Sequence, residues 1–223
     1  MTEKERAQQI LQILRREFSL PEWINSPKEP FSTLIRTVLS QATNDKNRDK
    51  AYRDLSERFE ITPEALVRAD VEEIERAIWV GGLYRNKSRV IKELSRVIVQ
   101  KFGGKLDFVY SSPLEEARKL LVGLPGVGPK TADVVLLFCA NRPVLPIDTH
   151  INRVSKRLGF IVSNANYESV RQTLESFYYP DDYLAAHLLL IMLGRRYCKA
   201  KKPLHESCPV NRLCPSAKPG DLT

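Results

Sequence analysis

Residues 124–132 read LPGVGPKTA, a glycine-rich turn that leads directly into a helix. Gly126 and Gly128 can adopt positive φ, and they place no side chain between the backbone and a ligand. Pro129 suits the first helical position, and the apolar run over residues 132–140 extends the helix. Backbone N–H groups at such a junction, together with the positive end of the helix, form a seat for a phosphate.

Two polar residues follow the turn, each near the start of a predicted helix. Lys130 lies in the first turn after Pro129, where positive potential favours the neutral amine. The neutral amine is the form of lysine that acts as a nucleophile. Asp148, in the segment PIDTH of residues 146–150, is predicted to cap the next helix, which ends at Gly159.

The segments LPGVGPKTADVVL and PIDTHINRV together resemble the helix-hairpin-helix DNA glycosylases, and most closely their endonuclease III branch. The resemblance covers nearly the whole chain. It implies that the hairpin residues Gly126, Val127 and Gly128 grip the DNA backbone. It also implies that Lys130 attacks the sugar C1′ while Asp148 assists. The alternative is a structural helical hairpin with a surface lysine and a capping aspartate.

The composition sets limits on the class of protein. The chain has 223 residues, enough for one large domain or two small ones, and its 35 basic and 27 acidic side chains give a formal charge of +8. Such a charge favours a polyanionic partner. No apolar run approaches the length of a membrane span, and the N-terminus lacks a signal-peptide core. We therefore expect a cytoplasmic, nucleoid-associated protein with no membrane partner.

Helical periodicity repeats along the chain and no stretch alternates as a strand would, so we predict an all-α fold. The expected helices cover residues 3–18, 31–40, 45–59, 63–69, 71–79, 86–102, 113–121, 129–140, 149–158, 167–177 and 182–197. The resemblance adds a two-lobed architecture with a DNA-binding cleft between the lobes. A six-helix domain over residues 25–132 would contain the hairpin, and residues 1–24 and 133–223 would form a discontinuous second lobe.

A glycosylase must extract its target base from the double helix, and the void that this leaves must be filled. Gly82-Leu83-Tyr84 is similar to the wedge loop of the family, so Leu83 is expected to intercalate; a leucine buried at a helix start is the alternative. The segment SQATND of residues 40–45 resembles a second family loop, from which Gln41 would enter the void. Ungapped alignment places Ala42, not Gln41, at the usual glutamine position.

Three of the four cysteines lie within residues 198–214, which in a reducing compartment indicates a metal site rather than disulfides. The family usually ends in four cysteines that bind a [4Fe–4S] cluster. The matching positions are Cys198, His205, Cys208 and Cys214, with the family spacing intact and a histidine as the second ligand. Three interpretations follow: a [4Fe–4S] cluster with unusual Cys3His ligation, a zinc site, or a loop without metal.

Lys201 and Lys202 lie in the loop between the first two of these ligand positions. A bound metal would hold this loop rigid, and we expect both lysines to contact DNA phosphates. A solvated charge run is the alternative interpretation.

These features predict a base-excision-repair DNA glycosylase with AP lyase activity, whose partner is double-stranded DNA with damaged bases or abasic sites. Lys130 would attack C1′ as the base leaves, and Asp148 would stabilise positive charge on the sugar. The resulting Schiff base permits β-elimination, and oxidised pyrimidines are the expected substrates. The alternatives are a glycosylase for mismatched thymine, uracil or oxidised purines, and a non-catalytic module that only holds DNA. Proteins of this family generally act as monomers.

Overall fold

The computed structural model describes residues 1–217 of the chain. The regular elements in that range are all helical, without a strand, which confirms the all-α prediction. The helices form two compact units. One unit runs from Pro27 to Arg142, and the other combines Met1–Ser26 with the chain from Pro143 onward. No helix within the described range is both long and apolar enough to span a membrane.

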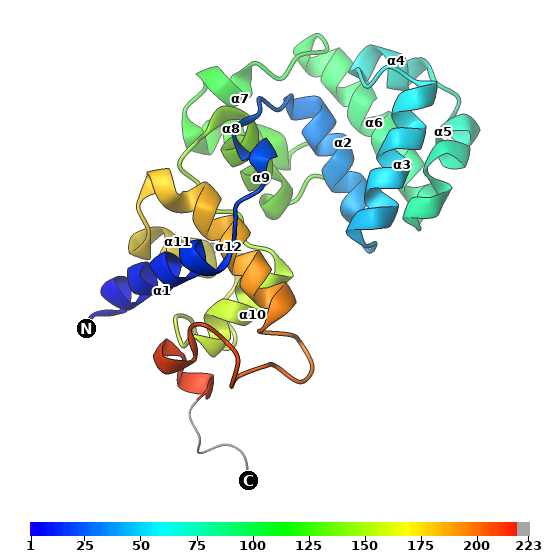
Figure 1. The fold of residues 1–223 in the computed structure, drawn as a ribbon. Helices are drawn as coiled ribbons and strands as arrows, with labels where there is room; N and C mark the ends of the chain where they lie inside the picture. Colours follow the sequence, from blue (N-terminus) through cyan, green and yellow to red (C-terminus); the bar gives the residue numbers. More distant parts are fainter. Residues whose placement is uncertain (218–223) are drawn as a thin grey trace. The chain divides into compact units, whose positions relative to one another are not determined.

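The unit of residues 27–142 is a bundle of helices that contains the glycine-rich turn. Its helices are α2 Pro30–Ser40, α3 Asp45–Arg58, α4 Pro63–Arg68, α5 Val71–Ile78, α6 Tyr84–Phe102, α7 Phe108–Ser111, α8 Leu114–Val122 and α9 Pro129–Ala140. The long helix α6 packs against α2, α4 and α5, while α9 packs against α2, α7 and α8 (Figure 1). Helix α2 therefore contacts both α6, which follows the expected wedge residue Leu83, and α9, which follows the glycine-rich turn.

The second unit is built from both ends of the chain. Its α-helices are α1 Glu3–Glu17, α10 Thr149–Arg157, α11 Tyr167–Phe177 and α12 Tyr183–Arg196, and short 3-10 turns cover Glu22–Asn25, Pro180–Asp182, Asn211–Leu213 and Pro215–Ala217. Helix α12 packs against both α1 and α10, and α1 also packs against α11. The N-terminal helix thus completes the core of a unit whose other helices lie far away in the sequence.

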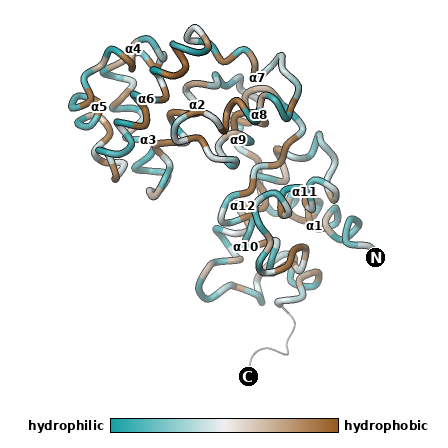
Figure 2. Tube along the Cα trace, turned by 180° about the vertical axis from the view of Figure 1, so that it is seen from behind, coloured by the Kyte–Doolittle hydropathy of each residue, from teal (hydrophilic) through white to brown (hydrophobic). Residues whose placement is uncertain are grey.

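Helix α9 is anchored in the core of its unit. Residues 131–137 are all buried, so this helix has no solvent-facing stripe over its middle turns. Figure 2 shows hydrophobic residues along α2 and α9. A helix held on all sides in this way gives a fixed direction to the residues of its first turn, including Lys130.

The helices match the expected ranges closely, with two differences, and the boundary between the two units also differs from the expected one. Helix α6 begins at Tyr84, two residues earlier than expected, and the four-residue α7 was not expected at all because one turn is too short to show a periodic pattern. The expected lobe boundary after residue 132 falls inside α9. The contacts of α9 with α2, α7 and α8 instead keep the whole helix in the unit of residues 27–142.

Candidate functional site

The glycine-rich turn joins α8 to α9 as the sequence predicts. Gly128 occupies the N-cap position of α9 with φ −92°, and Pro129 is the first helical residue. Gly126 has φ +74°, and a Cβ added there would lie 2.4 Å from Cγ1 of Val90 on α6. Only glycine satisfies both the positive φ and this close approach. The turn is therefore pressed against α6.

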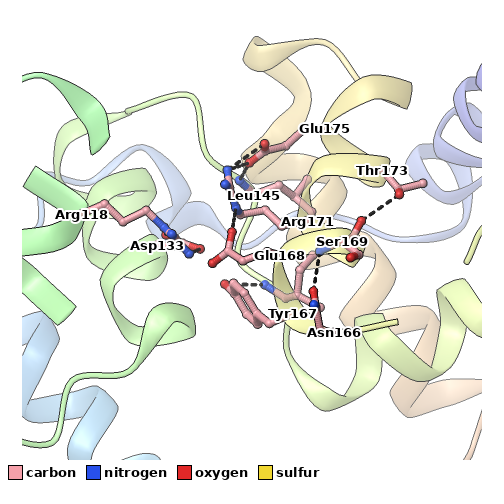
Figure 3. Close-up of polar contacts among 11 residues, drawn as sticks. Arg118, Asp133, Leu145, Asn166, Tyr167, Glu168, Ser169, Arg171, Thr173 and Glu175 are labelled. Atoms are coloured by element: carbon pink, nitrogen blue, oxygen red, sulfur yellow. Dashed lines mark hydrogen bonds and ion pairs between the residues drawn. The ribbon is translucent and has the colours of Figure 1, made fainter. Parts of the chain in front are cut away.

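Lys130 is half-buried in the first turn of α9. Three residues further along, Asp133 is fully buried and accepts hydrogen bonds from Arg118 of α8, at 2.6 Å from Nε and 3.3 Å from Nη2 (Figure 3). Such a two-bonded arginine–carboxylate pair fixes orientation as well as distance. The pair ties α8 to α9 directly behind the turn, and so fixes the backbone from which Lys130 projects.

Val127 differs from its two glycine neighbours. Its side chain is only 5% exposed, and its N–H donates to the carbonyl of Leu124 at 3.1 Å. The side chain and the N–H of Val127 are therefore both engaged within the protein, and neither is directed to a phosphate. Gly126 and Gly128 are exposed, as a backbone that approaches DNA must be.

Asp148 is the N-cap of α10, as predicted, and its Oδ1 accepts a hydrogen bond from the N–H of Ile151 at 2.7 Å. The capping bond holds the carboxylate at the positive end of the helix, which stabilises its charge. Helix α10 ends at Arg157, and Gly159 follows with φ +72°, so both predicted ends are confirmed.

The extended segment that leads to Asp148 is fixed from two directions. The N–H of Ile147 donates to Oη of Tyr167 at 3.3 Å, and the carbonyl of Pro146 lies 2.9 Å from Nδ1 of the buried His187. The N–H of Leu145 donates to Glu175 (Figure 3). These supports cannot be predicted from the sequence, because they come from α11 and α12 and no local sequence pattern indicates so distant a contact.

Glu175 is itself held by a buried cation. Arg171 of α11 donates from Nη1 to both oxygens of Glu175, at 3.0 and 2.9 Å, and from Nε to Glu168 at 3.0 Å (Figure 3). The side chain of Arg171 is only 8% exposed, so its contacts are poorly screened by water. The backbone before Asp148 therefore rests on a rigid charged network.

Two loops hold the residues expected to fill the void in DNA. Leu83 is 61% exposed and has φ 48°, so it is not a core leucine. Gln41 is exposed, and its Nε2 lies 3.5 Å from the carbonyl of Gly126 in the hairpin turn. Ala42, the next residue, also has positive φ, at 50°. Left-handed backbone is uncommon outside glycine and is enriched where a loop has a functional role.

The four candidate metal ligands line one cavity together with apolar side chains of α10 and α12. Burial raises the pKa of the Cys208 and Cys214 thiols, and the nearby Cys198 thiol raises the pKa of each further. Nevertheless, across residues 1–217 no three His, Cys, Asp or Glu side chains are arranged to hold a single metal ion. The donor set thus fits a metal group chemically, and its members surround a space rather than converge on a point.

The basic loop, residues 199–202, carries Lys201 and Lys202, and both side chains are exposed. Lys202 has φ 51°, so it too is a non-glycine residue in the left-handed region. Two arginines of α10, whose role no sequence motif indicates, hold the start of this loop. Arg153 donates from Nε to the carbonyl of Cys198 at 2.9 Å, and Arg157 donates to the carbonyls of residues 199 and 200.

Cys139, the fourth cysteine, lies outside the segment of residues 198–214 that contains the candidate metal ligands. Its Sγ donates to Oγ1 of Thr33 at 3.2 Å, and burial raises the pKa of the thiol to about 11. A thiol with so high a pKa is protonated at neutral pH, so it is a poor nucleophile.

Two families match this sequence. Residues 35–180 match the HhH-GPD superfamily of base excision DNA repair proteins. Residues 198–214 match the iron–sulfur binding domain of endonuclease III. The second match covers the cavity-lining cysteines and His205, which assigns this segment to an iron–sulfur binding domain.

Curated relatives are similar over most of their length. Endonuclease III of Sulfolobus acidocaldarius is 37% identical over 216 residues, which are 93% of this chain and 95% of the relative. Endonuclease III of Thermotoga maritima is 38% identical over 186 residues, or 83% of each chain.

Solved structures agree with these relatives. A trapped endonuclease III–DNA covalent intermediate superposes with a TM-score of 0.84 at 34% identity and covers 97% of this chain and 98% of the other. A thermostable thymine-DNA glycosylase has a TM-score of 0.78 at 23% identity, over 96% and 95% of the two chains, and this likeness concerns the fold.

Proposed function

Because the chain belongs to the HhH-GPD superfamily of base excision DNA repair proteins, we propose that it excises damaged bases from double-stranded DNA and then cleaves the strand as an AP lyase. Oxidised pyrimidines are the proposed substrates. The protein would act as a monomer on cytoplasmic, nucleoid DNA. The observation that carries the proposal is the position of Lys130, on the first turn of a core-anchored helix directly after an exposed glycine turn.

Lys130 is the proposed nucleophile. The N-terminal turn of α9 has a positive potential, which favours the neutral amine over the ammonium ion. Nζ would attack C1′ of the extruded nucleotide as the bond to the base breaks and the base leaves with its electron pair. Loss of a proton and ring opening of the sugar then give a Schiff base between Nζ and C1′. The Schiff base acidifies the proton at C2′, and β-elimination cleaves the strand on the 3′ side.

Asp148 is proposed to stabilise the positive charge that develops on the sugar as the base leaves. Its carboxylate is held by one capping bond from Ile151, and the segment before it is fixed by Tyr167, His187 and Glu175. A carboxylate held in this way reorganises little during the reaction, which is the condition for effective electrostatic catalysis.

Leu83 and Gln41 are proposed to enter the double helix, and Gly126, Gly128, Lys201 and Lys202 to contact the backbone. The two glycines are exposed beside a helix start, where backbone N–H groups donate hydrogen bonds to a phosphate, and the lysines are exposed on the basic loop. Phosphate contacts of this kind position the DNA and do not read its sequence. The choice of lesion is therefore left to the pocket that receives the extruded base.

We propose that Cys198, His205, Cys208 and Cys214 hold a [4Fe–4S] cluster. A single zinc ion needs its donors within about 2.0–2.3 Å of one point. A cluster has a separate iron for each ligand, so its donors surround a larger volume. The four side chains line one cavity without converging as single-ion ligands do, which favours the cluster over zinc. When bound, the cluster would supply cross-links that fix the basic loop.

Borohydride trapping tests the proposed chemistry. Reduction of a Schiff base gives a stable covalent complex between protein and DNA. We expect a complex on duplex DNA with thymine glycol and on duplex DNA with an abasic site, and none with undamaged duplex. Lys130→Ala should abolish trapping and keep most of the DNA affinity. Lys119→Ala, which removes an exposed lysine of α8, is the matched control and should trap as the native protein does.

The outcomes separate the alternatives. A complex on the abasic site alone would retain the lyase and redirect the search to mismatched or oxidised purine substrates. Trapping that persists in Lys130→Ala would exclude Lys130 as the nucleophile. Intact DNA binding with no complex on any substrate would indicate a non-catalytic module.

A further inference from the structure

Lys87 is a buried lysine in the first turn of α6, and the catalytic proposal does not use it. Its side chain is 2% exposed, and its Nζ donates to the carbonyl of Leu39 at 2.9 Å and to the carbonyl of Gly81 at 2.8 Å. Within residues 1–217 it forms no ion pair with a carboxylate. Burial lowers its pKa. Burial of an ammonium group whose only partners are carbonyls costs folding free energy, which indicates that Lys87 has a specific role.

The two carbonyls belong to the bases of two loops. Leu39 is two residues before Gln41, and Gly81 is two residues before Leu83. The glutamine loop, residues 40–43, and the wedge loop, residues 81–83, are thus joined through a single Nζ atom. The added Cβ of Gly81 would lie 3.3 Å from Cβ of Ala51, so the wedge loop also rests closely on α3.

Both loops contain a residue in the left-handed region, Ala42 with φ 50° and Leu83 with φ 48°. Such a backbone persists only where the surrounding structure holds it. Lys87 supplies a bond to each loop close to these residues. The same amine therefore supports the unusual backbone of both loops.

Helix α6 also supports the hairpin turn. Leu83, Lys87 and Val90 follow one another at helical spacing, and Val90 packs against Gly126. Gln41 reaches back from its own loop to the carbonyl of Gly126. Leu83, the expected wedge, thus lies at the N-cap of α6 on the same face as two residues of the helix. Of these, Lys87 bonds to the base of the glutamine loop and Val90 packs against the hairpin turn.

We propose that Lys87 is a positioning residue that fixes the spacing of the wedge and glutamine loops, so that Leu83 and Gln41 enter the DNA together. The inference rests on the proposed function. An apolar side chain of the same length would fill the same space, so packing alone does not require an amine here. The two hydrogen bonds are what lysine adds, and both end on loops that are to meet DNA.

The test replaces Lys87 with methionine, which has a similar length and no donor. Lys92→Met is the matched control, since Lys92 lies on the same helix and donates to the carbonyl of Ala69 at the end of α4. Three quantities are measured for each protein. They are single-turnover base excision from a damaged duplex, lyase activity on an abasic site in single-stranded DNA, and the fluorescence of 2-aminopurine placed opposite an abasic site in a duplex.

Insertion of side chains into the duplex unstacks 2-aminopurine and raises its fluorescence, whereas cleavage of a single strand needs no insertion. We expect Lys87→Met to slow excision by about tenfold or more, since a displacement of about 1 Å can cost up to a hundredfold. The fluorescence rise should be largely lost, and cleavage of the single strand should stay within about twofold. Lys92→Met should match the native protein in all three.

Equal losses in duplex excision and single-strand cleavage, with a lower melting temperature, would show that Lys87 is merely structural. A native protein that raises fluorescence but performs no cleavage would refute the proposed chemistry, and loss of that rise in Lys87→Met would still support positioning. Absence of a fluorescence rise in the native protein would overturn the inference, because no insertion would then exist to position. If Lys87→Met does not fold, Lys87→Gln takes its place, with one donor group on a shorter side chain.

Discussion

Arg157 donates a hydrogen bond from Nη1 to Sγ of Cys198 across 3.4 Å. The same guanidinium group donates to the carbonyl of Lys199 at 2.6 Å and, from Nη2, to that of Ala200 at 3.0 Å. A single side chain at the end of α10 therefore contacts a candidate ligand and the start of the basic loop. Since Asp148 caps the other end of α10, this one helix links a proposed catalytic residue to the iron–sulfur segment.

Arg157→Lys should loosen the basic loop while keeping its charge. Lysine cannot reproduce the forked donor geometry, and loss of a net hydrogen bond worth about 1 kcal/mol raises the open population about fivefold. Limited trypsin digestion measures this opening, because Lys199 and Lys201 are exposed cleavage sites in the loop. We expect cleavage there to be about fivefold faster, as that population implies. Cleavage at the native rate would contradict the assigned role of Arg157.

Lys201 and Lys202 should contribute to DNA affinity in a salt-dependent way. Each phosphate contact contributes about 0.9 to the slope of log affinity against log salt concentration. Replacing both lysines with alanine should therefore lower that slope by about 1.8 and weaken binding equally on all sequences. The measurement is fluorescence anisotropy of duplexes of different sequence over a range of salt concentrations. An unchanged slope would leave the two lysines as solvated surface charges.

The two glycines of the hairpin turn should respond differently to alanine. Gly126→Ala places a Cβ 2.4 Å from Val90 at φ +74°, and overpacking with left-handed strain costs about 2–4 kcal/mol in unfolding free energy. Gly128→Ala meets nothing within 4 Å at φ −92°, so stability should change by less than about 0.5 kcal/mol. Denaturant unfolding measures both variants.

DNA affinity separates these glycines further. The methyl group of Gly128→Ala would stand at an exposed helix start where the phosphate is proposed to approach, so this stable variant should bind abasic duplex less tightly. The double variant with Val90→Ala provides the control for Gly126→Ala, because it removes the clash and leaves the φ strain. If Gly128→Ala binds as tightly as the native protein, that glycine does not contact the backbone.

Local signals in the sequence were sufficient to predict most of the helices. Pro129 and Gly128 mark the start of α9, and Asp148 and Gly159 mark the ends of α10, because capping and left-handed turns are determined by the residue itself. The exposed state of Leu83 could not be predicted in this way, since an apolar residue at a helix start is as often buried.

The supports of the candidate site could not be predicted from local patterns. Lysine is a residue type that is mostly exposed, yet the structure buries Lys87 on the same face of α6 as Ile91 and Leu94. Its partners Leu39 and Gly81 are backbone carbonyls, which every residue has, so no sequence pattern distinguishes them. The contacts of Arg157 could not be predicted for the same reason, since its partners are largely backbone carbonyls of a loop about 40 residues further along the chain.

Asp148 should show separate structural and catalytic roles. Asparagine caps a helix about as well as aspartate, whereas alanine at an N-cap costs about 1 kcal/mol, or about 2–4 °C in melting temperature for a chain of this size. Asp148→Asn should therefore melt near the native temperature and lose about a hundredfold in single-turnover excision, since it removes the charge. Asp148→Ala should lose both. Native excision by Asp148→Asn would show that the residue acts only as a cap.

His205 offers a direct test of the proposed cluster. His205→Cys restores four thiolates, so we expect a brown protein with about four irons per chain, like the native protein, and a lower reduction potential. His205→Ala removes one ligand and should release iron faster when a chelator is added. Metal analysis, visible absorption and redox titration measure these properties on freshly purified protein. Stoichiometric zinc and no visible absorption in the native protein would overturn the cluster, and the four side chains would then have to close around a single ion.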